Sequence, residues 1–362
     1  MKKVVLCIPS LETGGAERFT VELARRLNPQ KFDVTVAVTR YMSESRFKKA
    51  LIDNGVRVVD LSAKHFFGML RRQLAFFKSE KPDIVHANTG AVLHVMLACA
   101  LCKIPGRIYT VHNEAKLLYN DHFFKKYAYK AALSLFRFTP VAVCDAVRET
   151  LCRDMHMSAE KIYTVYNGVD TARFRPIQRS AEKVVRAVSV GSLYAVKNQS
   201  MTIRIIKSLY DEGLPLTLTL VGDGVDRAKL QALIHELHAE DYITLCGALD
   251  DVAAELQKAD FFISASKTEG LPLSVLEAMA CGLPIIATAA GGCRDIVRDG
   301  ENGFLTPIDD ELALKAAVKM LAENKALREK FGAASRRLSE QWSIKSCVNG
   351  YEALYEKLSG KV

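Results

Sequence analysis

The sequence predicts an α/β protein with two doubly wound, Rossmann-like domains and helices at its C-terminal end, and three observations favour this fold class. The 362 residues are more than one ordinary domain needs and suit two. Short apolar runs rich in β-branched residues alternate with longer helical patterns, in two successive series. Strands that are apolar on both faces and joined by helices are typical of parallel sheets with both faces covered.

The expected strands fall into two groups along the chain. The first group comprises residues 4–8, 34–38, 56–61, 83–86, 107–111, 139–143 and 162–165. The second comprises residues 184–190, 216–221, 243–246, 261–264 and 284–288, after which only helical patterns follow. A stretch with Gly and Pro from Asn167 to Arg179 separates the groups, so we expect domains at 1–170 and 180–342. A last helix, at about 343–362, is a candidate for packing back on the first domain.

Composition favours a cytoplasmic globular protein. No apolar run reaches the roughly 18 residues of a membrane-spanning helix. The apolar start ends at Pro9 and is followed by glutamates and glycines, which is typical of a buried strand rather than a cleaved leader. The nine cysteines are odd in number, and Cys99-x-x-Cys102 has no second pair at zinc-site spacing, so we expect reduced core cysteines.

The positive charge is concentrated in the first half of the chain. Residues 1–170 hold 26 Lys and Arg against 16 Asp and Glu, whereas residues 171–362 hold 24 against 25. This asymmetry predicts an anionic partner for the first domain, either nucleic acid or an anionic membrane surface. No recognised nucleic-acid-binding motif accompanies the charge, so we expect a membrane surface and no nucleic acid.

Candidate site residues follow the expected strands, because ligands of such sheets bind beyond the carboxyl ends of the strands. Gly14 and Gly15 lie between the first strand and first helix, where a backbone can approach a phosphate closely or simply turn tightly. His112 follows the strand at 107–111, and an imidazole there can donate a hydrogen bond to a sugar hydroxyl. Considered alone, His112 and the similarly placed His86 are more often satisfied structural histidines.

Two further elements lie in the second half of the chain. Lys197 stands at a helix start, where a cation opposes the helix dipole and makes better sense as a ligand of a diphosphate. The stronger element is Glu269-Gly270-Leu271-Pro272-Leu273-Ser274-Val275-Leu276-Glu277, between a strand and a helix. Carboxylates such as Glu269 and Glu277 accept hydrogen bonds from vicinal diols, and the helix start can hold a diphosphate.

Together with Asn167-Gly168-Val169-Asp170 and Gly222-Asp223-Gly224, these elements resemble the retaining glycosyltransferases of family 4. That family has the GT-B fold, in which two Rossmann-like domains face a central cleft. The resemblance covers essentially the whole chain in the right order, and Glu269-x7-Glu277 is its most specific part. It implies transfer of a sugar from a nucleotide diphosphate, expected to be UDP with GDP as the alternative, with retention of anomeric configuration and no cofactor.

The resemblance also implies roles for individual residues. Catalysis would fall to His112, Lys197 and Glu269. Glu277 would bind the donor ribose and Leu249 would lie beside the base. The remaining implied donor contacts are Gly15, Ser192, Lys197, Glu269, Gly270, Leu271 and Leu273. Gly14 and Arg18 would face the acceptor, which is expected to be a glycan or a lipid-linked glycan bound mainly by the first domain.

One position departs from the family pattern. Ser192 stands where the family commonly has an arginine, so one cation of the usual Arg/Lys pair is missing. Either another basic residue substitutes for it or the donor is held differently. The sequence contains no Asp-x-Asp, so a metal-bridged diphosphate is not expected, and Lys197 and helix N–H groups would neutralise the leaving phosphate.

Two segments of the first domain mix basic and aromatic residues. Residues 64–78 and 123–130 can each lie on an anionic leaflet with their aromatic side chains down. The alternative is that the aromatics pack on the sheet and the bases are solvated. With the basic first domain as background, we expect peripheral contact with the inner face of the cell membrane.

Two other functions are compatible with parts of the sequence. A nucleotide-sugar epimerase would also have such domains, but Glu269, Glu277 and Lys197 argue against it. A catalytically weak GT-B scaffold at the membrane is supported by Ser192 alone. We therefore expect a transferase that makes a polysaccharide, a lipopolysaccharide or another glycoconjugate.

Overall fold

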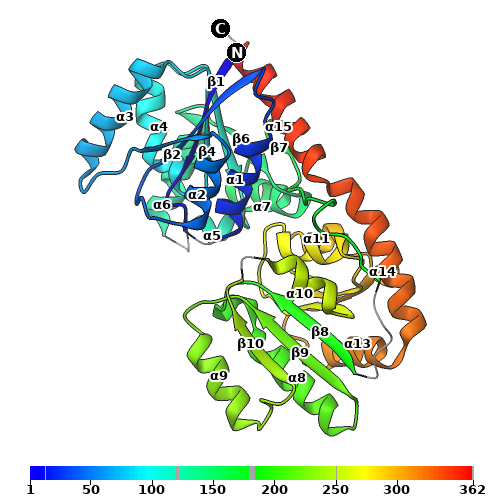
Figure 1. The fold of residues 1–362 in the computed structure, drawn as a ribbon. Coiled ribbons are helices and arrows are strands. Elements are labelled where there is room, and N and C mark those ends of the chain that lie inside the picture. The colour runs from blue at the N-terminus through cyan, green and yellow to red at the C-terminus, as the bar shows by residue number, and fades with distance from the viewer. Residues whose placement is uncertain (13, 120–121, 179–183, 250, 361–362) are drawn as a thin grey trace. The chain divides into compact units, whose positions relative to one another are not determined.

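The computed structural model describes residues 1–362 except 13, 120–121, 179–183, 250 and 361–362. The chain divides into two compact units (Figure 1). Unit 1 comprises Met1–Asn167 and Lys345–Val362, and unit 2 comprises Gly168–Ile344. Thr13 of the glycine loop, Asp250 beside Leu249 and residue 180, the expected start of the second domain, lie outside the described residues.

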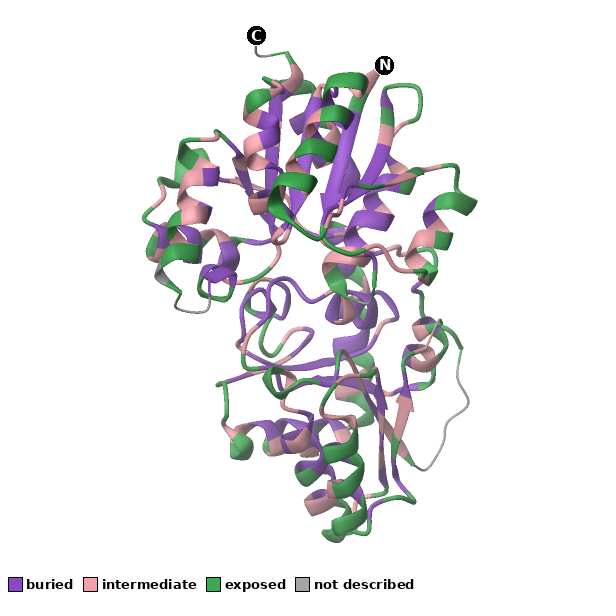
Figure 2. Ribbon diagram, turned by 90° about the vertical axis from the view of Figure 1, so that its left-hand side faces the viewer, coloured by how far each residue is buried: buried purple, intermediate pink, exposed green. Residues whose placement is uncertain are grey.

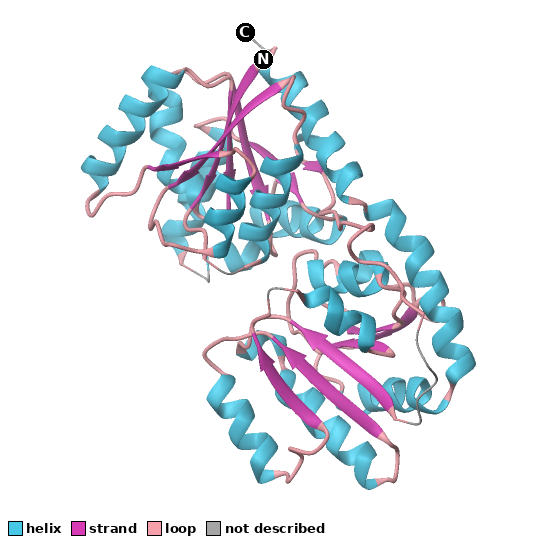
Figure 3. Ribbon diagram, viewed as in Figure 1, coloured by secondary structure: helices cyan, strands magenta, loops and turns pink. Residues whose placement is uncertain are grey.

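Unit 1 contains a seven-stranded parallel sheet in the order β3-β2-β1-β4-β5-β6-β7. Its inner strands are buried over most of their length, whereas the two edge strands are not (Figure 2). They are β1 (Lys2–Ile8), β2 (Phe32–Val38), β3 (Arg57–Asp60), β4 (Ile84–Asn88), β5 (Gly106–Val111), β6 (Thr139–Ala142) and β7 (Tyr163–Thr164). Helices flank this sheet (Figure 3). They are α1 (Gly15–Arg26), α2 (Arg46–Asp53), α3 (Phe66–Glu80), α4 (Ala91–Leu101), α5 (Ala115–Tyr119), α6 (Phe123–Ser134), α7 (Asp145–Met155), the short η1 (Ala159–Lys161) and α15 (Ile344–Ser359).

Unit 2 contains a six-stranded parallel sheet in the order β10-β9-β8-β11-β12-β13. Its strands are β8 (Val185–Val190), β9 (Leu216–Val221), β10 (Ile243–Gly247), β11 (Phe261–Ser264), β12 (Ile285–Thr288) and β13 (Gly303–Thr306). The helices are η2 (Ala195–Lys197), α8 (Gln199–Asp211), α9 (Arg227–Glu236), α10 (Val252–Lys258), α11 (Leu273–Ala280), α12 (Cys293–Ile296), α13 (Glu311–Glu323), α14 (Lys325–Ser339) and η3 (Glu340–Trp342).

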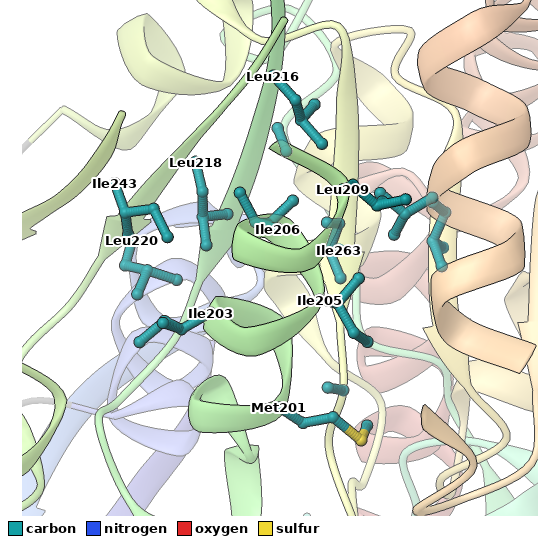
Figure 4. Close-up of a cluster of buried hydrophobic side chains, with 14 of the residues drawn as sticks. Met201, Ile203, Ile205, Ile206, Leu209, Leu216, Leu218, Leu220, Ile243 and Ile263 are labelled. Carbon is teal, nitrogen blue, oxygen red and sulfur yellow. The ribbon is translucent and has the colours of Figure 1, made fainter. Parts of the chain in front are cut away.

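The core of unit 2 explains why this chain segment folds as it does. Apolar residues recur on one face of α8, and Ile203, Ile206 and Leu209 bury that face against the sheet (Figure 4). Leu218 and Leu220 of β9 pack in the same buried cluster. Each fully buried side chain of this size contributes about 1.5–3 kcal/mol relative to exposure.

Every expected strand is present, with ends within two residues of the expected ones, and the prediction of two Rossmann-like domains is confirmed. Strand β13 was not predicted, because Phe304 and Leu305 are only half-buried in a short run at the sheet edge. In the described part of the chain no helix is both long and apolar enough to cross a bilayer. None of the nine cysteines, all of which are described, forms a disulfide.

Candidate active site

The candidate residues of unit 2 gather beyond the carboxyl ends of its strands. Glu269 lies in the loop after β11, and its side chain is 9% exposed. Lys197, at the end of η2 after β8, donates from Nζ to Glu269 Oε1 at 2.6 Å. The two residues are 72 positions apart in the sequence, yet the sheet brings them into an ion pair.

Ser266 completes the environment of Glu269. Its buried hydroxyl donates to Glu269 Oε1 at 2.7 Å, so this oxygen accepts two hydrogen bonds. The other carboxylate oxygen, Oε2, has no partner among the described residues. Ser266 was not predicted from the sequence, although its position two residues after β11 places it at the same sheet edge. The arrangement fixes the carboxylate and leaves one oxygen available to accept hydrogen bonds from hydroxyl groups.

The ion pair gives Lys197 a partner that the sequence analysis did not foresee. A cation at the start of α8 suggested a phosphate ligand, but in this structure Glu269 balances its charge. The main chain ties the two loops together as well, since Lys267 N donates to Val196 O at 2.7 Å. A diphosphate that binds Lys197 therefore either displaces the Glu269 carboxylate from the ammonium group or binds that group together with it.

Two glycines let the loops approach closely. A Cβ on Gly291, whose φ is +47°, would lie 1.9 Å from Glu269 O, and Gly292 N donates to Gly270 O at 2.6 Å. A Cβ on Gly222, whose φ is +145°, would lie 1.9 Å from Gly191 O. Neither position accepts a side chain without displacement of the loop it contacts, so both glycines set the shape of this sheet edge.

Helix α11 begins directly after the Glu269 loop. Pro272 caps it, and the main-chain N–H groups of Leu273 and Ser274 have no partner among the described residues. Free N–H groups at a helix start attract anions. Glu277 lies in the same helix and is 3% exposed. Gly270 and Leu271, which precede the helix, are buried.

The two other donor candidates of unit 2 follow neighbouring strands. Ser192, after β8, is exposed, and its carbonyl accepts from Gln199 Nε2 at 3.0 Å. Leu249, after β10, is half-buried. Arg227, at the start of α9, is the basic residue beside Gly247. A Cβ added to Gly247 would lie 3.0 Å from Arg227 Nη1. That guanidinium lies 3.7 Å from Asp223 Oδ2.

The candidates of unit 1 lie at the carboxyl edge of its own sheet. Gly15 begins α1 after Gly14, and a Cβ on Gly15 would meet nothing within 4 Å. Arg18 is half-buried on the first turn. The Glu17 side chain lies against Gly14, since a Cβ on Gly14 would be 2.2 Å from Glu17 Oε2. Burial raises the pKa of the Glu17 carboxyl group. The helix start that the sequence analysis assigned to an anion therefore already holds an acidic group.

His112 is held by a neighbour that the sequence analysis missed. Its Nε2 lies 2.9 Å from Oδ1 of the buried Asn88, at the end of β4, and the Phe19 ring packs edge-on against the imidazole. Burial lowers the pKa of His112 to about 3, so the ring is neutral at pH 7. In a neutral imidazole one ring nitrogen donates and the other accepts, so Asn88 orients the His112 ring and leaves Nδ1 for a second hydrogen bond.

His86 has a structural role. Its Nδ1 lies 2.6 Å from the Tyr355 hydroxyl and its Nε2 lies 2.7 Å from Thr110 Oγ1. Thr110 in turn contacts the Tyr351 hydroxyl at 2.9 Å. All four side chains are buried, and the two tyrosines belong to α15. The network satisfies both ring nitrogens, so His86 is not available to a ligand.

Comparison with protein-family models gives two matches that together cover most of the chain. The model described as Glycosyltransferase Family 4 matches residues 13–173, and the model described as Glycosyl transferases group 1 matches residues 170–338. The chain belongs to the family 4 glycosyltransferases. The predicted family is thereby confirmed, and the enzyme is a glycosyltransferase of the GT-B type.

Relatives and solved structures agree with this assignment. An uncharacterized glycosyltransferase of Methanocaldococcus jannaschii is 26% identical to this glycosyltransferase over 96% of this chain and 95% of its own. An N-acetylgalactosaminyltransferase of Campylobacter jejuni that acts on a diphospho-undecaprenol-linked sugar is 30% identical over 51% and 50% of the two chains. The crystal structure of Anabaena HepE in complex with UDP-glucose superposes with a TM-score of 0.83 at 20% identity, covering 99% of this chain and all of that one. This likeness shows that the fold is GT-B.

Proposed function

We propose that this glycosyltransferase moves a hexose from a UDP-sugar to a glycan or lipid-linked acceptor, with retention of anomeric configuration and without a metal ion. The observation that carries the proposal is the buried Glu269, fixed by Lys197 and Ser266 through one oxygen while the other has no partner among the described residues. The alternative nucleotide is GDP. The UDP-glucose bound to the GT-B neighbour HepE supports UDP.

Each donor group has a complementary group in unit 2. The free N–H groups of Leu273 and Ser274 and the ammonium of Lys197 suit the diphosphate. Glu269 Oε2 suits sugar hydroxyls, and Glu277 is assigned to the ribose. Gly270, Leu271, Ser192 and Leu249 complete the proposed donor contacts, with Leu249 beside the base. The cation missing at Ser192 leaves Lys197 as the main counter-charge of the diphosphate.

Unit 1 provides the remaining proposed groups. His112, whose ring is neutral, is proposed to form a hydrogen bond through Nδ1 with a hydroxyl of the transferred sugar. Gly15 is assigned to the donor side, and Gly14 and Arg18 to the acceptor. A Cβ added to Gly15 would have no atom within 4 Å, and this open space supports a ligand beside Gly15.

The proposed step needs no protein nucleophile. The bond between the anomeric carbon and the leaving diphosphate breaks, and the acceptor oxygen forms its bond on the same face. The acceptor proton passes to an oxygen of the leaving diphosphate, so charge and atoms balance. Lys197 and the N–H groups at the start of α11 stabilise the negative charge that develops on that diphosphate.

Two substitutions separate donor binding from transfer. We expect Glu277→Ala to weaken UDP binding by about tenfold or more, because a buried carboxylate that holds a diol contributes about 1.5–3 kcal/mol. Glu269→Ala should lose transfer while UDP, which carries no sugar, binds within a few-fold of wild type. Isothermal titration with UDP, GDP and ADP measures binding, and sugar release measures transfer.

The control for this experiment is Lys229→Ala, which removes an exposed lysine of α9 that has no partner among the described residues. It should leave both readouts unchanged. Equal UDP affinity in wild type and Glu277→Ala would overturn the ribose assignment. Binding of none of the three nucleotides at millimolar concentration would overturn the donor proposal.

Two helices of unit 1 support peripheral contact with an anionic membrane. Phe67, near the start of α3, is 81% exposed, and Phe124, near the start of α6, is 87% exposed. Basic residues of the segments 64–78 and 123–130 stand on the same helices. Aromatic side chains exposed beside lysines and arginines are typical of helices that lie at a membrane interface.

Flotation with liposomes tests the membrane contact. Wild type should float with vesicles that contain phosphatidylglycerol, should do so less at 0.5 M salt than at 0.05 M, and should not float with phosphatidylcholine alone. Charge reversal at four basic residues of the two helices should abolish flotation: Arg71, Arg72, Lys125 and Lys126. A matched reversal at four exposed bases elsewhere should not: Lys49, Arg204, Lys229 and Lys330. Flotation that is equal in both variants would contradict the assignment to these helices.

A further inference from the structure

An open hollow of about 690 Å³ lies in unit 1, away from the residues assigned to sugar transfer. Thr139 and Tyr163, which begin β6 and β7, line it, so it lies at the amino ends of these strands. The strands of this sheet are parallel, and His112 follows the carboxyl end of the neighbouring β5. The hollow is therefore at the opposite sheet edge from the candidate active site. Its volume is within the usual range of small-molecule sites.

Basic side chains from four separate segments surround this hollow. Lys130 comes from α6, Arg137 precedes β6, His156 follows α7 and Lys161 ends η1. Glu160 is the only acidic residue among the described lining residues. None of these five side chains has an ion pair or hydrogen bond within the described part of the chain. Positive charge therefore exceeds negative charge at the rim, with no internal partner.

Some other cations of this sheet edge do have acidic partners. Arg57, which begins β3 at the same edge, pairs with Glu80 at 2.8 Å. Lys31, just before β2, pairs with Glu356 at 3.0 Å. A further cation lies beside the hollow, because Lys357 Nζ stands 4.9 Å from the centre of the Tyr163 ring.

The floor of the hollow, meaning its most buried lining residues, is apolar. Phe138, Met155 and Leu358 are at least nine-tenths buried and line it, and the partly buried Leu133 and Met157 extend the surface. Leu358 comes from α15, so the C-terminal helix closes one side. An apolar floor under a cationic rim is complementary to a molecule with a hydrocarbon part and an anionic head.

A second hollow at the same edge helps to define the ligand. It measures about 500 Å³ and is lined by Lys78, Lys81 and Lys103 together with Asp83. Its described lining residues include lysines but no arginine, whereas the first hollow offers the planar guanidinium of Arg137. Arginine matches the geometry of phosphate oxygens by donating two hydrogen bonds at once.

We propose that the hollow between α6, β6, η1 and α15 binds an amphiphile with a phosphate head group and a hydrocarbon chain. The phosphate is bound by Arg137, Lys130 and Lys161, and the chain lies on Phe138, Met155 and Leu358. The proposal does not rest on glycosyl transfer. It shares Lys130 with the segment 123–130 assigned to the membrane contact, but it does not use the aromatic starts of α3 and α6.

Titration of the full-length protein with alkyl phosphates tests the proposal. Dodecyl phosphate below its micellar concentration should bind, octyl phosphate should bind more weakly, and inorganic phosphate should bind weakest of the three. Arg137→Glu/Lys161→Glu, at two exposed positions, should weaken dodecyl phosphate binding by about tenfold or more. Neutral dodecyl maltoside should bind no more tightly to wild type than to this variant.

The matched control is Lys81→Glu/Lys103→Glu, which makes the same change in net charge at the same sheet edge. Arg137, Lys81 and Lys103 all have positive φ, near 50°, so the backbone demands are similar. The control should bind dodecyl phosphate within about threefold of wild type. An equal loss in both variants would show that a diffuse positive field attracts the ligand and would overturn the proposal.

Two other outcomes would also overturn it. Affinity that does not depend on chain length would mean that the apolar floor is not used. Binding to phosphatidylglycerol vesicles but not to monomeric dodecyl phosphate would assign this face to a membrane surface rather than to a pocket. If the charge-reversal variant does not fold, Arg137→Gln/Lys161→Gln replaces it, and it should still weaken binding by several-fold.

Discussion

At the scale of single residues, Glu269 is the candidate site group whose contacts are best defined. Lys197 and Ser266 both donate to Oε1, so the carboxylate has one oriented oxygen and one available oxygen. Glu269 and Lys197 were each predicted from the sequence as site residues. Their contact was not predicted, because they lie on different loops 72 residues apart. Ser266 and Asn88 were not predicted because serine and asparagine are common at strand ends and carry no motif of their own.

Removal of the Ser266 hydroxyl tests whether this residue positions Glu269. In Ser266→Ala the carboxylate loses one of two donors, and a hydrogen bond to a charged group contributes about 1.5–3 kcal/mol. We expect kcat to fall by roughly tenfold or more, while UDP affinity stays within about twofold because UDP carries no sugar for Glu269 to bind. Transfer kinetics and calorimetry measure the two quantities.

The control is Ser264→Ala, since Ser264 Oγ contacts Ser266 at 3.2 Å but not the carboxylate. Its kcat should remain within a few-fold of wild type. Parallel losses of kcat and of UDP affinity in Ser266→Ala would indicate general damage to the loop and not loss of carboxylate orientation.

At the scale of elements, α15 is held on the sheet of unit 1 by a buried polar network. Tyr351 and Tyr355 of α15 contact Thr110 and His86, and Phe19 packs edge-on against both His86 and His112. The periodicity of this helix showed an apolar face but not which side chains would meet it. A buried histidine whose two nitrogens are satisfied cannot be distinguished by sequence from a ligand-binding one.

This network makes stability depend on acid pH. Burial lowers the pKa of His86 to about 3, against an ordinary value of 6.5. Below pH 6.5 the unfolded chain therefore takes up a proton that the folded chain does not, and stability falls as the pH drops from 6.5 towards 3. The loss approaches about 1.4 kcal/mol per pH unit for this residue.

Replacement of the histidine should remove that dependence. Urea unfolding of His86→Gln should be measured between pH 6.5 and 4.5. The free energy of unfolding should fall less steeply with decreasing pH than in wild type, and the slopes should differ by up to about 1.4 kcal/mol per pH unit, which corresponds to one proton. His65→Gln, at an exposed histidine whose side chain has no partner among the described residues, is the control and should keep the wild-type slope. Identical slopes in wild type and His86→Gln would mean that the buried imidazole does not resist protonation.

At the scale of the whole molecule, the two series of strands were predictable from the sequence. Apolar β-branched runs at regular spacing require covered parallel strands, and all twelve expected strands are present. Strand β13 escaped prediction because Gly303-Phe304-Leu305-Thr306 is short and half-buried at an edge. The composition showed the excess of positive charge in the first half but not that part of it surrounds a hollow at the amino edge of the sheet.

The division into two units predicts two unfolding transitions. Residues 345–362 belong to unit 1, and Tyr351, Tyr355 and Leu358 of this segment are buried there. Deletion of residues 345–362 should remove these contacts and leave His86 Nδ1 without its partner, which costs several kcal/mol by loss of buried apolar surface and one hydrogen bond. Calorimetry should show one transition lowered or lost and the other unchanged.

UDP identifies which transition belongs to which unit. A ligand that binds only the folded form raises its stability by mass action, so the transition of unit 2 should move upward with UDP concentration in both full-length and shortened chains. In the shortened chain this is the transition that the deletion leaves unchanged. A deletion that lowers the UDP-sensitive transition instead would show that the last helix supports unit 2, or that the donor-binding residues are not where Lys197, Glu269 and Glu277 place them.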